Sequence, residues 1–409
     1  MASNPVKRAT KAFIIDGIRT PIGNFGGCLA TIRPDDLAAL VLKKLFERQH
    51  QVDLKDIADV LLGCANQAGE DNRNVARMAV LLAGLPQSIP AETLNRLCAS
   101  GMSAVAAASR AIWAEEGLLY VAGGVESMTR APYVISKSAQ AFGRDAQFFD
   151  TSFGWRFINP KLQAQYGTHS MGETAENLAE MYQISRADQD AFALSSQLKA
   201  AKAQASGFFA EHIVPVPVQK NKNETVLIEK DEFIKPQSTL EALRNLKPAF
   251  KKEGSVTAGN ASGLNDGAIA LLMASSEGAE KYQLKPLAEV VSTGIYGVEP
   301  KIMGIGPVKA SQMALERAGL KLSDLAVIEI NEAFAAQVLA CSRQLGIADD
   351  DKRLNPNGGA IALGHPLGMS GARIVLQAAK ELQRAGGEYA LCTMCVGVGQ
   401  GYAVVIKRA

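Results

Sequence analysis

Short hydrophobic runs alternate with longer amphipathic segments towards both ends of the chain. Uninterrupted apolar runs of this length are typical of buried strands, and apolar positions repeating every three or four residues are typical of helices. The predicted strands lie at residues 12–15, 60–62, 118–122, 327–330, 389–393 and 402–406. The clearest predicted helices of the second half lie at residues 307–318 and 372–385. Strands joined by helical crossovers indicate an α/β layered fold.

The two ends of the chain share short matching segments. Leu-Lys-Asp-Ile at residues 54–57 corresponds to Leu-Ser-Asp-Leu at residues 322–325, which lies 268 positions later. Gly-Met-Ser at residues 101–103 recurs at residues 368–370, which lies 267 positions later, and each copy opens an alanine-rich stretch. Two matches in the same order and at nearly one offset predict a duplicated unit. We therefore expect two similar halves that share one core.

The segment between these halves has a different character. From about residue 126 to residue 252 it is richer in charge and in Gln, Asn and Ser, with few strand-like runs. Ser185 and Asp188 have the spacing of a capping box, which predicts a helix that runs to Gly207. We interpret the segment as an insertion. Such insertions either cover an active site or elaborate the surface.

Composition and charge exclude several classes of protein. The 409 residues are 47% hydrophobic and 21% charged, which indicates a globular chain and argues against disorder or a coiled coil. A net charge of +2 provides no field that would capture nucleic acid or an anionic membrane. No apolar run is long enough to cross a bilayer, and residues 1–11 lack the hydrophobic centre of a secretory signal. We expect a cytoplasmic protein with neither nucleic-acid nor membrane partners.

Six cysteines are too few for a disulfide framework in a chain of this length, so we expect mostly reduced thiols. Cys98 stands out because it immediately precedes a helix predicted over residues 102–114. The dipole and free N–H groups of a helix N-terminus favour a thiolate, which predicts a thiol pKa below about 8.5, as a nucleophile needs. A buried structural cysteine at a strand-to-helix turn is equally consistent with this segment alone.

The duplication links Cys98 to His365, which lies 267 positions later in a Gly-His-Pro segment. A pseudo-twofold axis would bring the two turns together. An imidazole facing a thiol can take its proton and then stabilise charge on a substrate oxygen. The glycines on both sides of His365 permit close approach of backbone and substrate. The alternative is a core or surface role for this histidine.

Cys392 and Cys395 have the C-x-x-C spacing of a redox dithiol or of half a zinc site. No second pair or histidine cluster completes a metal shell, and the motif ends a predicted strand, so we predict neither a redox dithiol nor a metal site. The glycine loop at residues 397–401 offers N–H groups for an oxyanion hole. Its spacing departs from G-x-G-x-x-G and it leads into a strand, so it is no dinucleotide fingerprint.

Two further segments each allow two interpretations. Asn331 follows a predicted strand, where its amide could hold a water against an oxyanion or could cap a helix, the commoner use of Asn. The small-residue loop at residues 257–263 could let a long ligand approach its backbone, or could simply form a tight turn.

Cys98, the Asn-Glu-Ala-Phe block that begins at Asn331, the Gly-His-Pro block around His365 and Cys395 before its glycine loop occur in the order found in thiolases. Over essentially its whole length the chain resembles this family of acyl-CoA C-acyltransferases. The resemblance implies a five-layer αβαβα core and a homodimer or homotetramer. It also implies a division of the chain into a first half at residues 1–124 completed by about 253–283, a coenzyme A-binding loop domain at 125–252, and a second half at 284–409.

The resemblance also implies a role for each matching residue. Cys98 would accept the acyl group as a thioester, and His365 would activate its thiol. Cys395 would act as acid and base on the acetyl-CoA enolate and on the incoming coenzyme A. Asn331 would position a water which, with His365, stabilises the enolate oxygen. The backbone N–H groups of Cys98 and Gly397 would stabilise the tetrahedral oxyanion.

For coenzyme A, which would be a co-substrate and not a permanently bound cofactor, the resemblance implies a pantetheine tunnel lined by Ser262, Met171 and Phe334. One position departs from the family pattern. Many thiolases place a histidine directly before the Met-Gly pair, whereas here Ser170 precedes Met171 and His169 stands one position earlier.

Residues 69–77 and 153–160 look most like the thiolases that cleave 3-oxoadipyl-CoA in bacterial aromatic degradation. A dicarboxylate acyl chain needs a cation or hydrogen-bond donors for its distal carboxylate, which Arg156 or His169 could supply. A general short-chain acetoacetyl-CoA thiolase is the next alternative. A ketoacyl synthase generally carries two histidines where this chain offers His365 and Cys395, and a silent acyl-CoA carrier need not retain the complete reactive set.

Overall fold

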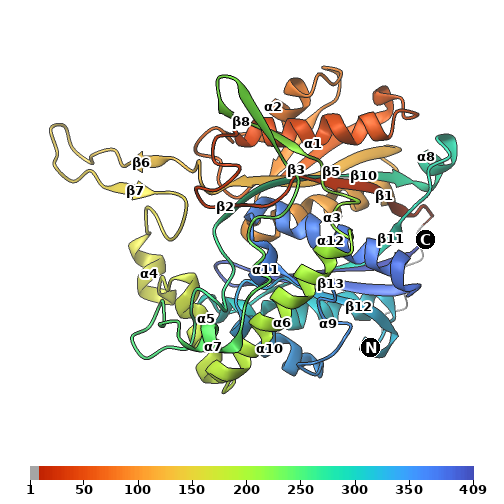
Figure 1. Ribbon diagram of the computed structural model, residues 1–409. Coiled ribbons are helices and arrows are strands. Elements are labelled where there is room, and N and C mark those ends of the chain that lie inside the picture. Colours follow the sequence, from red (N-terminus) through yellow and green to blue (C-terminus); the bar gives the residue numbers. More distant parts are fainter. Residues whose placement is uncertain (1–8) are drawn as a thin grey trace.

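Five alternating layers of helices and strands make up the core of the chain in the computed structural model, which describes residues 9–409 (Figure 1). One outer layer contains α1 (Pro34–Arg48) and α2 (Val75–Leu82), and the other contains α9 (Gly306–Ala318) and α10 (Ala335–Leu345). Helices α3 (Ser100–Trp113) and α12 (Leu367–Ala385) form the middle layer. The predicted αβαβα arrangement is confirmed. Most of the segment in which we found no secretory signal lies outside the described residues.

The strands of both halves form one hydrogen-bonded ladder in the order β12-β13-β14-β11-β1-β10-β5-β3-β4. The first half contributes β1 (Ala12–Arg19), β3 (Ile57–Gly63), β4 (Ala91–Leu94), β5 (Leu119–Ser127) and β10 (Asn265–Ser275), with β2 (Gly23–Asn24) beside β10. The second half contributes β11 (Ala288–Gly297), β12 (Leu325–Ile330), β13 (Tyr389–Val396) and β14 (Gln400–Arg408). The halves join where β1 pairs with β11 through Phe13–Glu289 and Ile14–Ala288. Strands covered on both faces are hydrophobic throughout, which is why sequence alone located most of them.

The duplication predicted from the sequence is present in the fold. A single 3-10 turn, η1 (Leu54–Asp56), leads into β3, and the matching turn η4 (Leu322–Asp324) leads into β12. The repeated Gly-Met-Ser segments open α3 and α12, which pack against each other. A Cβ added to Gly101 would lie only 2.5 Å from the Gly368 carbonyl oxygen. Glycine is therefore required at this crossing, and it brings the turns before the two helices close together.

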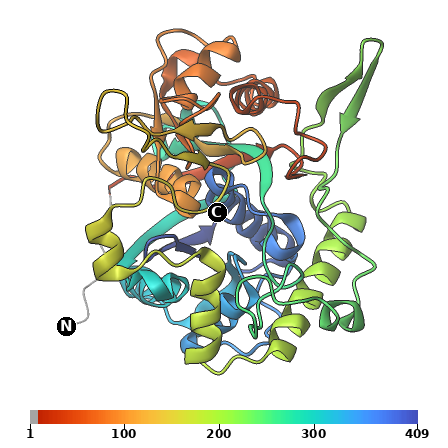
Figure 2. The ribbon, with the colours of Figure 1, turned by 90° about the vertical axis from the view of Figure 1, so that its left-hand side faces the viewer.

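The middle segment forms two hairpins and four helices outside the main ladder. The elements are β6 (Tyr133–Ile135), β7 (Phe148–Asp150), α4 (Pro160–Tyr166), α5 (Met171–Met181), α6 (Arg186–Ala205), β8 (Val216–Asn221), β9 (Glu224–Ile228) and α7 (Leu240–Arg244). The capping box of Ser185 and Asp188 is confirmed at the start of α6. The β6–β7 hairpin projects from the body in Figure 1, and the β8–β9 hairpin stands clear of it in Figure 2. Sequence analysis missed both hairpins because their strands are short and largely exposed.

The middle segment packs mainly against the second half. Leu178 of α5, Phe192 of α6 and Leu243 of α7 share a buried cluster with Val338 and Leu339 of α10. The remaining short elements are η2 (Leu97–Ala99), α8 (Ser276–Lys281), η3 (Pro300–Ile305) and α11 (Ala360–Leu363). Within residues 9–409, no helix has the length and apolar character needed to cross a bilayer.

Candidate active site

Cys98 lies in η2, the single turn that joins β4 to α3. Its thiol receives a hydrogen bond from the Gly397 N–H, which comes from the other half of the chain. Cys98 keeps part of its surface exposed, yet burial raises the pKa of its thiol to about 11. The lowered pKa predicted from the sequence is therefore wrong, because the loss of water around the sulfur outweighs the N–H groups of Gly397 and Cys98. The thiol needs a base when it reacts.

His365 lies in the turn before α12 with only 4% of its surface exposed. Its Nδ1 lies 2.6 Å from the Ser370 hydroxyl oxygen, and that hydroxyl donates to the Pro366 carbonyl at 2.8 Å. Because the hydroxyl proton is already used, Nδ1 must carry the proton of the neutral ring, which leaves Nε2 as the basic nitrogen. Asn331 Nδ2 faces that nitrogen at 3.4 Å.

The imidazole of His365 is neutral in this environment. Burial, followed by the positive charge of Arg373, lowers its pKa to about 3. The backbone is fixed as well, because the His365 N–H donates to Asn265 Oδ1 at 2.9 Å. Gly364 has a φ of +101° and abuts the Asn265 side chain, so both its backbone conformation and its packing require glycine. His365 can therefore accept a proton at Nε2 from a fixed position.

Asn331 ends β12 beside His365 and is 1% exposed. Its N–H donates to the Thr393 carbonyl at 3.0 Å, and its Oδ1 has no hydrogen-bond partner among residues 9–409. Helix α10 begins only at Ala335, with Phe334 as its N-cap, so the helix-cap interpretation of Asn331 is wrong. A buried amide oxygen without a partner is suited to hold a water.

Cys395 lies on β13 and is fully buried. Burial raises the pKa of its thiol, and the charge of Cys98 raises it further, so the two sulfurs are within electrostatic reach. Cys392, three residues earlier on the same strand, points to the opposite face, where its thiol contacts the Ile374 carbonyl at 3.6 Å. Both cysteines are free. The C-x-x-C spacing therefore does not form a dithiol, as the sequence analysis expected.

Cys395 belongs to a small apolar cluster that contains Phe334 and is bordered by Met171. Gly397 is also near Met171, because a Cβ added to Gly397 would lie 3.7 Å from the Met171 sulfur. The Ser262 N–H donates to the Ala333 carbonyl at 2.9 Å, which places Ser262 beside Phe334. The residues predicted to line the pantetheine tunnel are thus brought together around Cys395.

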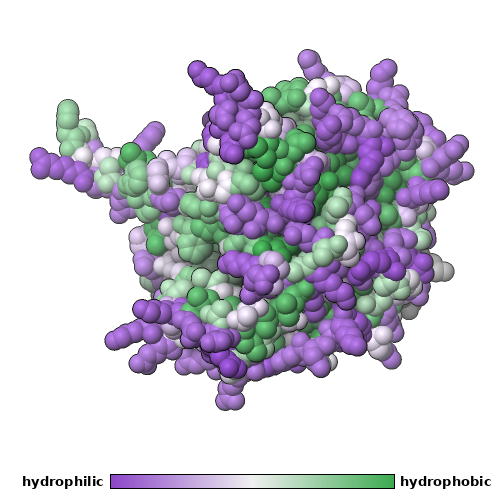
Figure 3. All heavy atoms as spheres, viewed as in Figure 1, coloured by the Kyte–Doolittle hydropathy of each residue, from purple (hydrophilic) through white to green (hydrophobic). Residues whose placement is uncertain are grey.

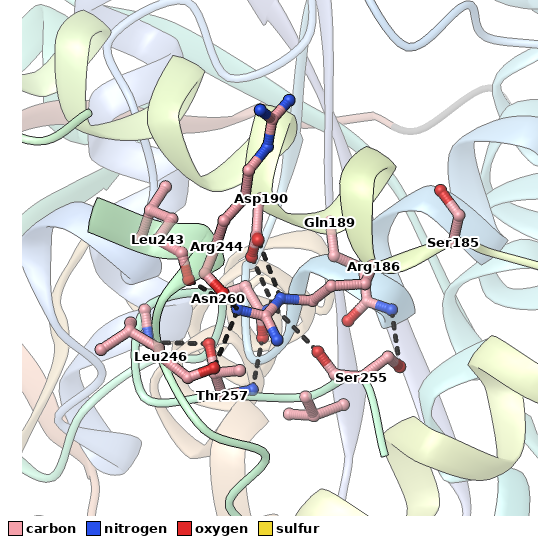
Figure 4. A network of polar contacts seen from close by, with 12 residues as sticks. Ser185, Arg186, Gln189, Asp190, Leu243, Arg244, Leu246, Ser255, Thr257 and Asn260 are labelled. Atoms are coloured by element: carbon pink, nitrogen blue, oxygen red, sulfur yellow. Dashed lines mark hydrogen bonds and ion pairs between the residues drawn. The ribbon is translucent and has the colours of Figure 1, made fainter. Parts of the chain in front are cut away.

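The small-residue loop that carries Ser262 is held by a buried polar network (Figure 4). Asn260 donates to Asp190 of α6 at 3.0 Å, and Arg186 donates to the same carboxylate at 2.8 Å. The Thr257 N–H donates to Asn260 Oδ1 at 2.8 Å. These bonds fix the loop to α6.

A pocket opens beside Met171 and Val398. It is lined by Trp155, Tyr166, Gly167, His169, Met171, Pro300, Lys301 and Val398. His169 is exposed at this pocket, and its carbonyl accepts from Trp155 Nε1 at 3.0 Å. Arg156 is half-buried and is not among the lining residues within the described part of the chain. Ser170, which stands where many thiolases have a histidine, is the N-cap of α5 and forms a capping box with Glu173.

Comparison with known proteins decides the family. Residues 12–277 match the thiolase N-terminal domain, and residues 284–408 match the thiolase C-terminal domain. The chain belongs to the thiolase family. It is 60% identical over 398 residues to a protein of Pseudomonas knackmussii named beta-ketoadipyl-CoA thiolase, with 97% of this chain and 99% of that protein covered. It is 59% identical, with the same coverage, to the 3-oxoadipyl-CoA/3-oxo-5,6-dehydrosuberyl-CoA thiolase of Escherichia coli.

Solved structures of thiolases share the fold. The Bacillus anthracis acetyl-CoA acetyltransferase superposes with a TM-score of 0.91 at 40% identity, with 99% of this chain and 100% of that one covered. Human mitochondrial 3-ketoacyl-CoA thiolase, solved in complex with CoA, superposes with a TM-score of 0.91 at 39% identity, with both chains fully covered.

One buried group in this thiolase has the side chains of a metal site. The ligand atoms of Cys64, Asp71 and Glu126 lie within 4.8 Å of one another. The carboxylate of Glu126 already accepts three backbone N–H bonds, from residues 65, 66 and 368, and the Cys64 thiol contacts the Asn66 carbonyl at 2.8 Å. Burial raises the pKa of Glu126 to about 7. Backbone donors thus satisfy the carboxylate, and the arrangement needs no cation.

Sequence analysis missed two residues that the structure adds to the site. Ser370 fixes the tautomer of His365, and it was visible only as part of the repeated Gly-Met-Ser segment. Lys301 lines the pocket beside His169, but three separate segments build that pocket, so no local motif could have indicated this lysine. Side chains that meet only through tertiary packing leave no signal in a single sequence.

Proposed function

We propose that this thiolase cleaves 3-oxoadipyl-CoA with coenzyme A to give succinyl-CoA and acetyl-CoA. Two observations support the proposal: the Cys98 and Cys395 thiols lie within electrostatic reach of each other, and Asn331 faces His365 Nε2 at 3.4 Å. The close crossing of α3 and α12 at Gly101 and Gly368 brings the turns that carry Cys98 and His365 towards each other. The names of the relatives from Pseudomonas knackmussii and Escherichia coli support the substrate.

In the first step the Cys98 sulfur attacks the C3 ketone while its proton passes to His365 Nε2. The N–H groups of Cys98 and Gly397 hold the oxyanion. The C2–C3 bond then breaks, and its electron pair forms the acetyl-CoA enolate, whose oxygen faces His365 and a water on Asn331. The Cys395 thiol donates its proton to C2, which releases acetyl-CoA and leaves succinyl-Cys98.

In the second step the Cys395 thiolate takes the proton of coenzyme A. The new thiolate attacks the Cys98 thioester, the N–H groups of Cys98 and Gly397 again hold the oxyanion, and the Cys98 sulfur leaves. The protonated His365 returns its proton to the Cys98 sulfur, so the products are succinyl-CoA and the regenerated thiol. The two thiols thus have distinct roles, because Cys98 holds the acyl group whereas Cys395 moves protons at the carbon and at coenzyme A.

The pKa values determine when the Cys98 proton moves. A thiol with a pKa of about 11 and an imidazole with a pKa of about 3 differ by about 8 units. Separating the proton in the empty site is therefore unfavourable, because burial disfavours both the thiolate and the imidazolium. The proton moves as the carbon–sulfur bond forms, and the empty site keeps both groups neutral.

We assign coenzyme A to the loop domain at residues 125–252 and to the tunnel formed by Ser262, Met171 and Phe334. The apolar cluster around Cys395 supports this tunnel, because it places Met171 and Phe334 beside the thiol that must meet coenzyme A. Coenzyme A is a co-substrate that enters and leaves with each turnover, and no permanently bound cofactor takes part. The boundaries near residues 124, 252 and 284 remain predictions.

For the distal carboxylate of the substrate, the pocket supports His169 more strongly than Arg156. His169 and Lys301 both line it, and it adjoins Gly397 through Met171 and Val398. Two basic side chains in one pocket fit a dicarboxylate acyl chain. An acetoacetyl-CoA thiolase has no charge to place there, which makes it the weaker alternative.

We propose a homodimer or homotetramer. Exposed aromatic side chains on the β6–β7 hairpin support this, and Figure 3 shows hydrophobic residues among those of the projection. The exposed residues are Tyr133, Ile135, Phe142 and Phe148. Six free cysteines fit a reducing compartment, so we also propose a cytoplasmic location. Light scattering of the purified chain measures the oligomeric state.

The function is tested by incubating the protein with 3-oxoadipyl-CoA and, separately, acetoacetyl-CoA. We expect succinylated Cys98 by peptide mass spectrometry and a higher kcat/KM for the first substrate. Cys98→Ala should fold and lose thiolysis. A clear preference for acetoacetyl-CoA would refute the substrate, and full activity of Cys98→Ala would refute the nucleophile. Acyl-CoA binding without turnover would instead indicate a carrier.

A further inference from the structure

Arg96 connects the turn that carries Cys98 to the loop that carries Gly397. Its Nη1 donates to Gln400 Oε1 at 2.8 Å, and its Nε donates to Ser103 Oγ at 3.0 Å. Arg96 belongs to the first half of the chain, directly before η2, whereas Gln400 begins β14 in the second half. One guanidinium thus bridges the two halves beside the reacting groups.

Short chains of bonds connect this bridge to the turn of the nucleophile. The Arg96 N–H donates to Ser100 Oγ at 2.9 Å, and the same hydroxyl donates to the Leu97 carbonyl at 2.6 Å. Arg96, two residues before Cys98, is therefore fixed through both its side chain and its backbone. A shift of the guanidinium would move the Cys98 turn with it.

The other end of the bridge is attached just as directly. Gln400 pairs with Val396 at the base of the β13–β14 turn, and Gly397 is the first residue of that turn. The Gly399 carbonyl accepts from the N–H of Val298, the residue directly after β11, at 2.8 Å. Gln400 is thus the point at which Arg96 holds the loop of the Gly397 donor.

Backbone strain lies at both ends of the bridge. Leu97 has a φ of +47° and Val398 has a φ of +64°. This region is uncommon for any residue with a side chain and is a clear outlier for a β-branched one. Leu97 precedes Cys98 and Val398 follows Gly397, so each strained residue adjoins one of the two N–H donors. Strained conformations persist only where the surroundings hold them.

The two loops also touch directly, since a Cβ added to Gly397 would lie 3.1 Å from Leu97 Cδ1. The guanidinium itself lies 5.6 Å from the centre of the buried Tyr402 ring. Two directed hydrogen bonds together with a flat face over an aromatic ring require arginine, because a lysine ammonium offers neither the fork nor the plane.

We propose that Arg96 and Gln400 are positioning residues that hold the N–H groups of Cys98 and Gly397 at the separation an oxyanion requires. The inference rests on the proposed function, in which both N–H groups bind one oxygen. Because they come from different halves, their separation depends on how the two loops are joined. A displacement of about 1 Å at a reacting centre can cost about 100-fold in rate. If the Arg96–Gln400 bridge served stability alone, its loss would lower the melting temperature without selectively slowing the chemical step.

Gln400→Leu tests the bridge because it removes the acceptor while keeping a side chain of similar size. Gln400→Glu keeps an acceptor for Arg96. The matched control is Arg110→Met, since Arg110 contacts the Tyr402 hydroxyl at 3.3 Å without reaching the glycine loop. Rapid-quench mass spectrometry measures the rate of Cys98 acylation, steady-state assays give kcat and KM for coenzyme A, and calorimetry gives the melting temperature.

We expect Gln400→Leu to lower the acylation rate and kcat by about 10- to 100-fold with KM for coenzyme A within about threefold of wild type. Gln400→Glu should stay within about threefold of wild type in kcat, and Arg110→Met should match wild type. Acylation of Gln400→Leu at the wild-type rate, or a Gln400→Glu variant as slow as Gln400→Leu, would overturn the inference.

Two further outcomes have defined meanings. If Gln400→Leu does not fold, Gln400→Asn replaces it, because the shorter amide draws the acceptor back by one methylene and should still slow acylation about tenfold. An unchanged rate in that variant overturns the inference too. A wild-type protein that never acquires an acyl group on Cys98 would overturn the proposed function, and the inference with it. Normal wild-type acylation together with an insensitive Gln400 would overturn the inference alone.

Discussion

Ser370→Ala removes the single side chain that determines which nitrogen of His365 is basic. The hydroxyl makes two buried hydrogen bonds, one from His365 Nδ1 at 2.6 Å and one to the Pro366 carbonyl at 2.8 Å. Without the first bond the Nδ1–H has no acceptor on this side chain. The ring can then place its proton on Nε2, the nitrogen that we propose receives the proton of Cys98.

The size of the effect follows from these contacts. A net hydrogen bond is worth about 1 kcal/mol, and a buried donor left without a partner costs about 1–3 kcal/mol. The productive tautomer should therefore lose about 1–2 kcal/mol relative to the other one, and a loss of 1.4 kcal/mol corresponds to a factor of ten. We expect Cys98 acylation to slow by about 5- to 30-fold and the protein to lose about 2 kcal/mol of stability.

Stopped-flow or rapid-quench acylation measures the rate, and urea unfolding measures the stability. Ser109→Ala is the matched control, because Ser109 is also buried in a helix and donates to a carbonyl four residues earlier, but it does not contact a histidine. The control should lose comparable stability and keep its acylation rate. The reasoning is refuted if Ser370→Ala acylates as fast as the control, since His365 would then not depend on this hydroxyl for its tautomer.

Three further predictions address the other groups. Cys395→Ala should still form the Cys98 thioester from an acyl-CoA but lose overall thiolysis by at least about 100-fold, which mass spectrometry and a coupled assay can separate. His169→Ala and Lys301→Met should each lower kcat/KM for 3-oxoadipyl-CoA by about tenfold and leave acetoacetyl-CoA within about twofold, so an equal loss for both substrates would contradict the carboxylate assignment. Burial raises the pKa of Glu329 on β12 from its usual 4.5 to about 8, so the stability that its neutral form provides is fully present below pH 4.5 and is lost as the pH rises through 8. Between pH 6 and 9 the wild type should therefore lose about 3 kcal/mol of stability relative to Glu329→Gln, as measured by urea unfolding. Parallel stability curves for the two proteins would rule out this titration.

The sequence predicted the core well because the core is where local pattern and tertiary burial agree. Strands such as β5 and β13 are buried on both faces, so they appear as continuous hydrophobic runs, whereas the sequence analysis did not predict the equally buried β10. The repeated Gly-Met-Ser segments revealed the duplication because only glycine fits where α3 crosses α12. The two hairpins were missed because solvent covers most of their surface, and their strands therefore lack a hydrophobic pattern.

The residues of the candidate site were easier to predict than the pKa of the Cys98 thiol. The helix that follows Cys98 predicted a lowered thiol pKa, but burial of the sulfur has the larger effect and raises that pKa. Asn331 allowed two interpretations until the start of α10 showed that it caps no helix. Lys301 lies in one pocket with His169 only because of tertiary packing. Ser370 reaches His365, five residues earlier, only through the turn that opens α12.

Placing the site at the crossing of α3 and α12 has a consequence for synthesis. Cys98 emerges from the ribosome 267 residues before His365, which at about 5–20 residues per second corresponds to roughly 15 to 50 s. Throughout that interval the nascent chain carries the Cys98 thiol without the residues proposed as its base and its second oxyanion donor. On the proposed mechanism, acyl transfer therefore waits until His365 and Gly397 have both been synthesised, and a chain that stops before them cannot consume acyl-CoA.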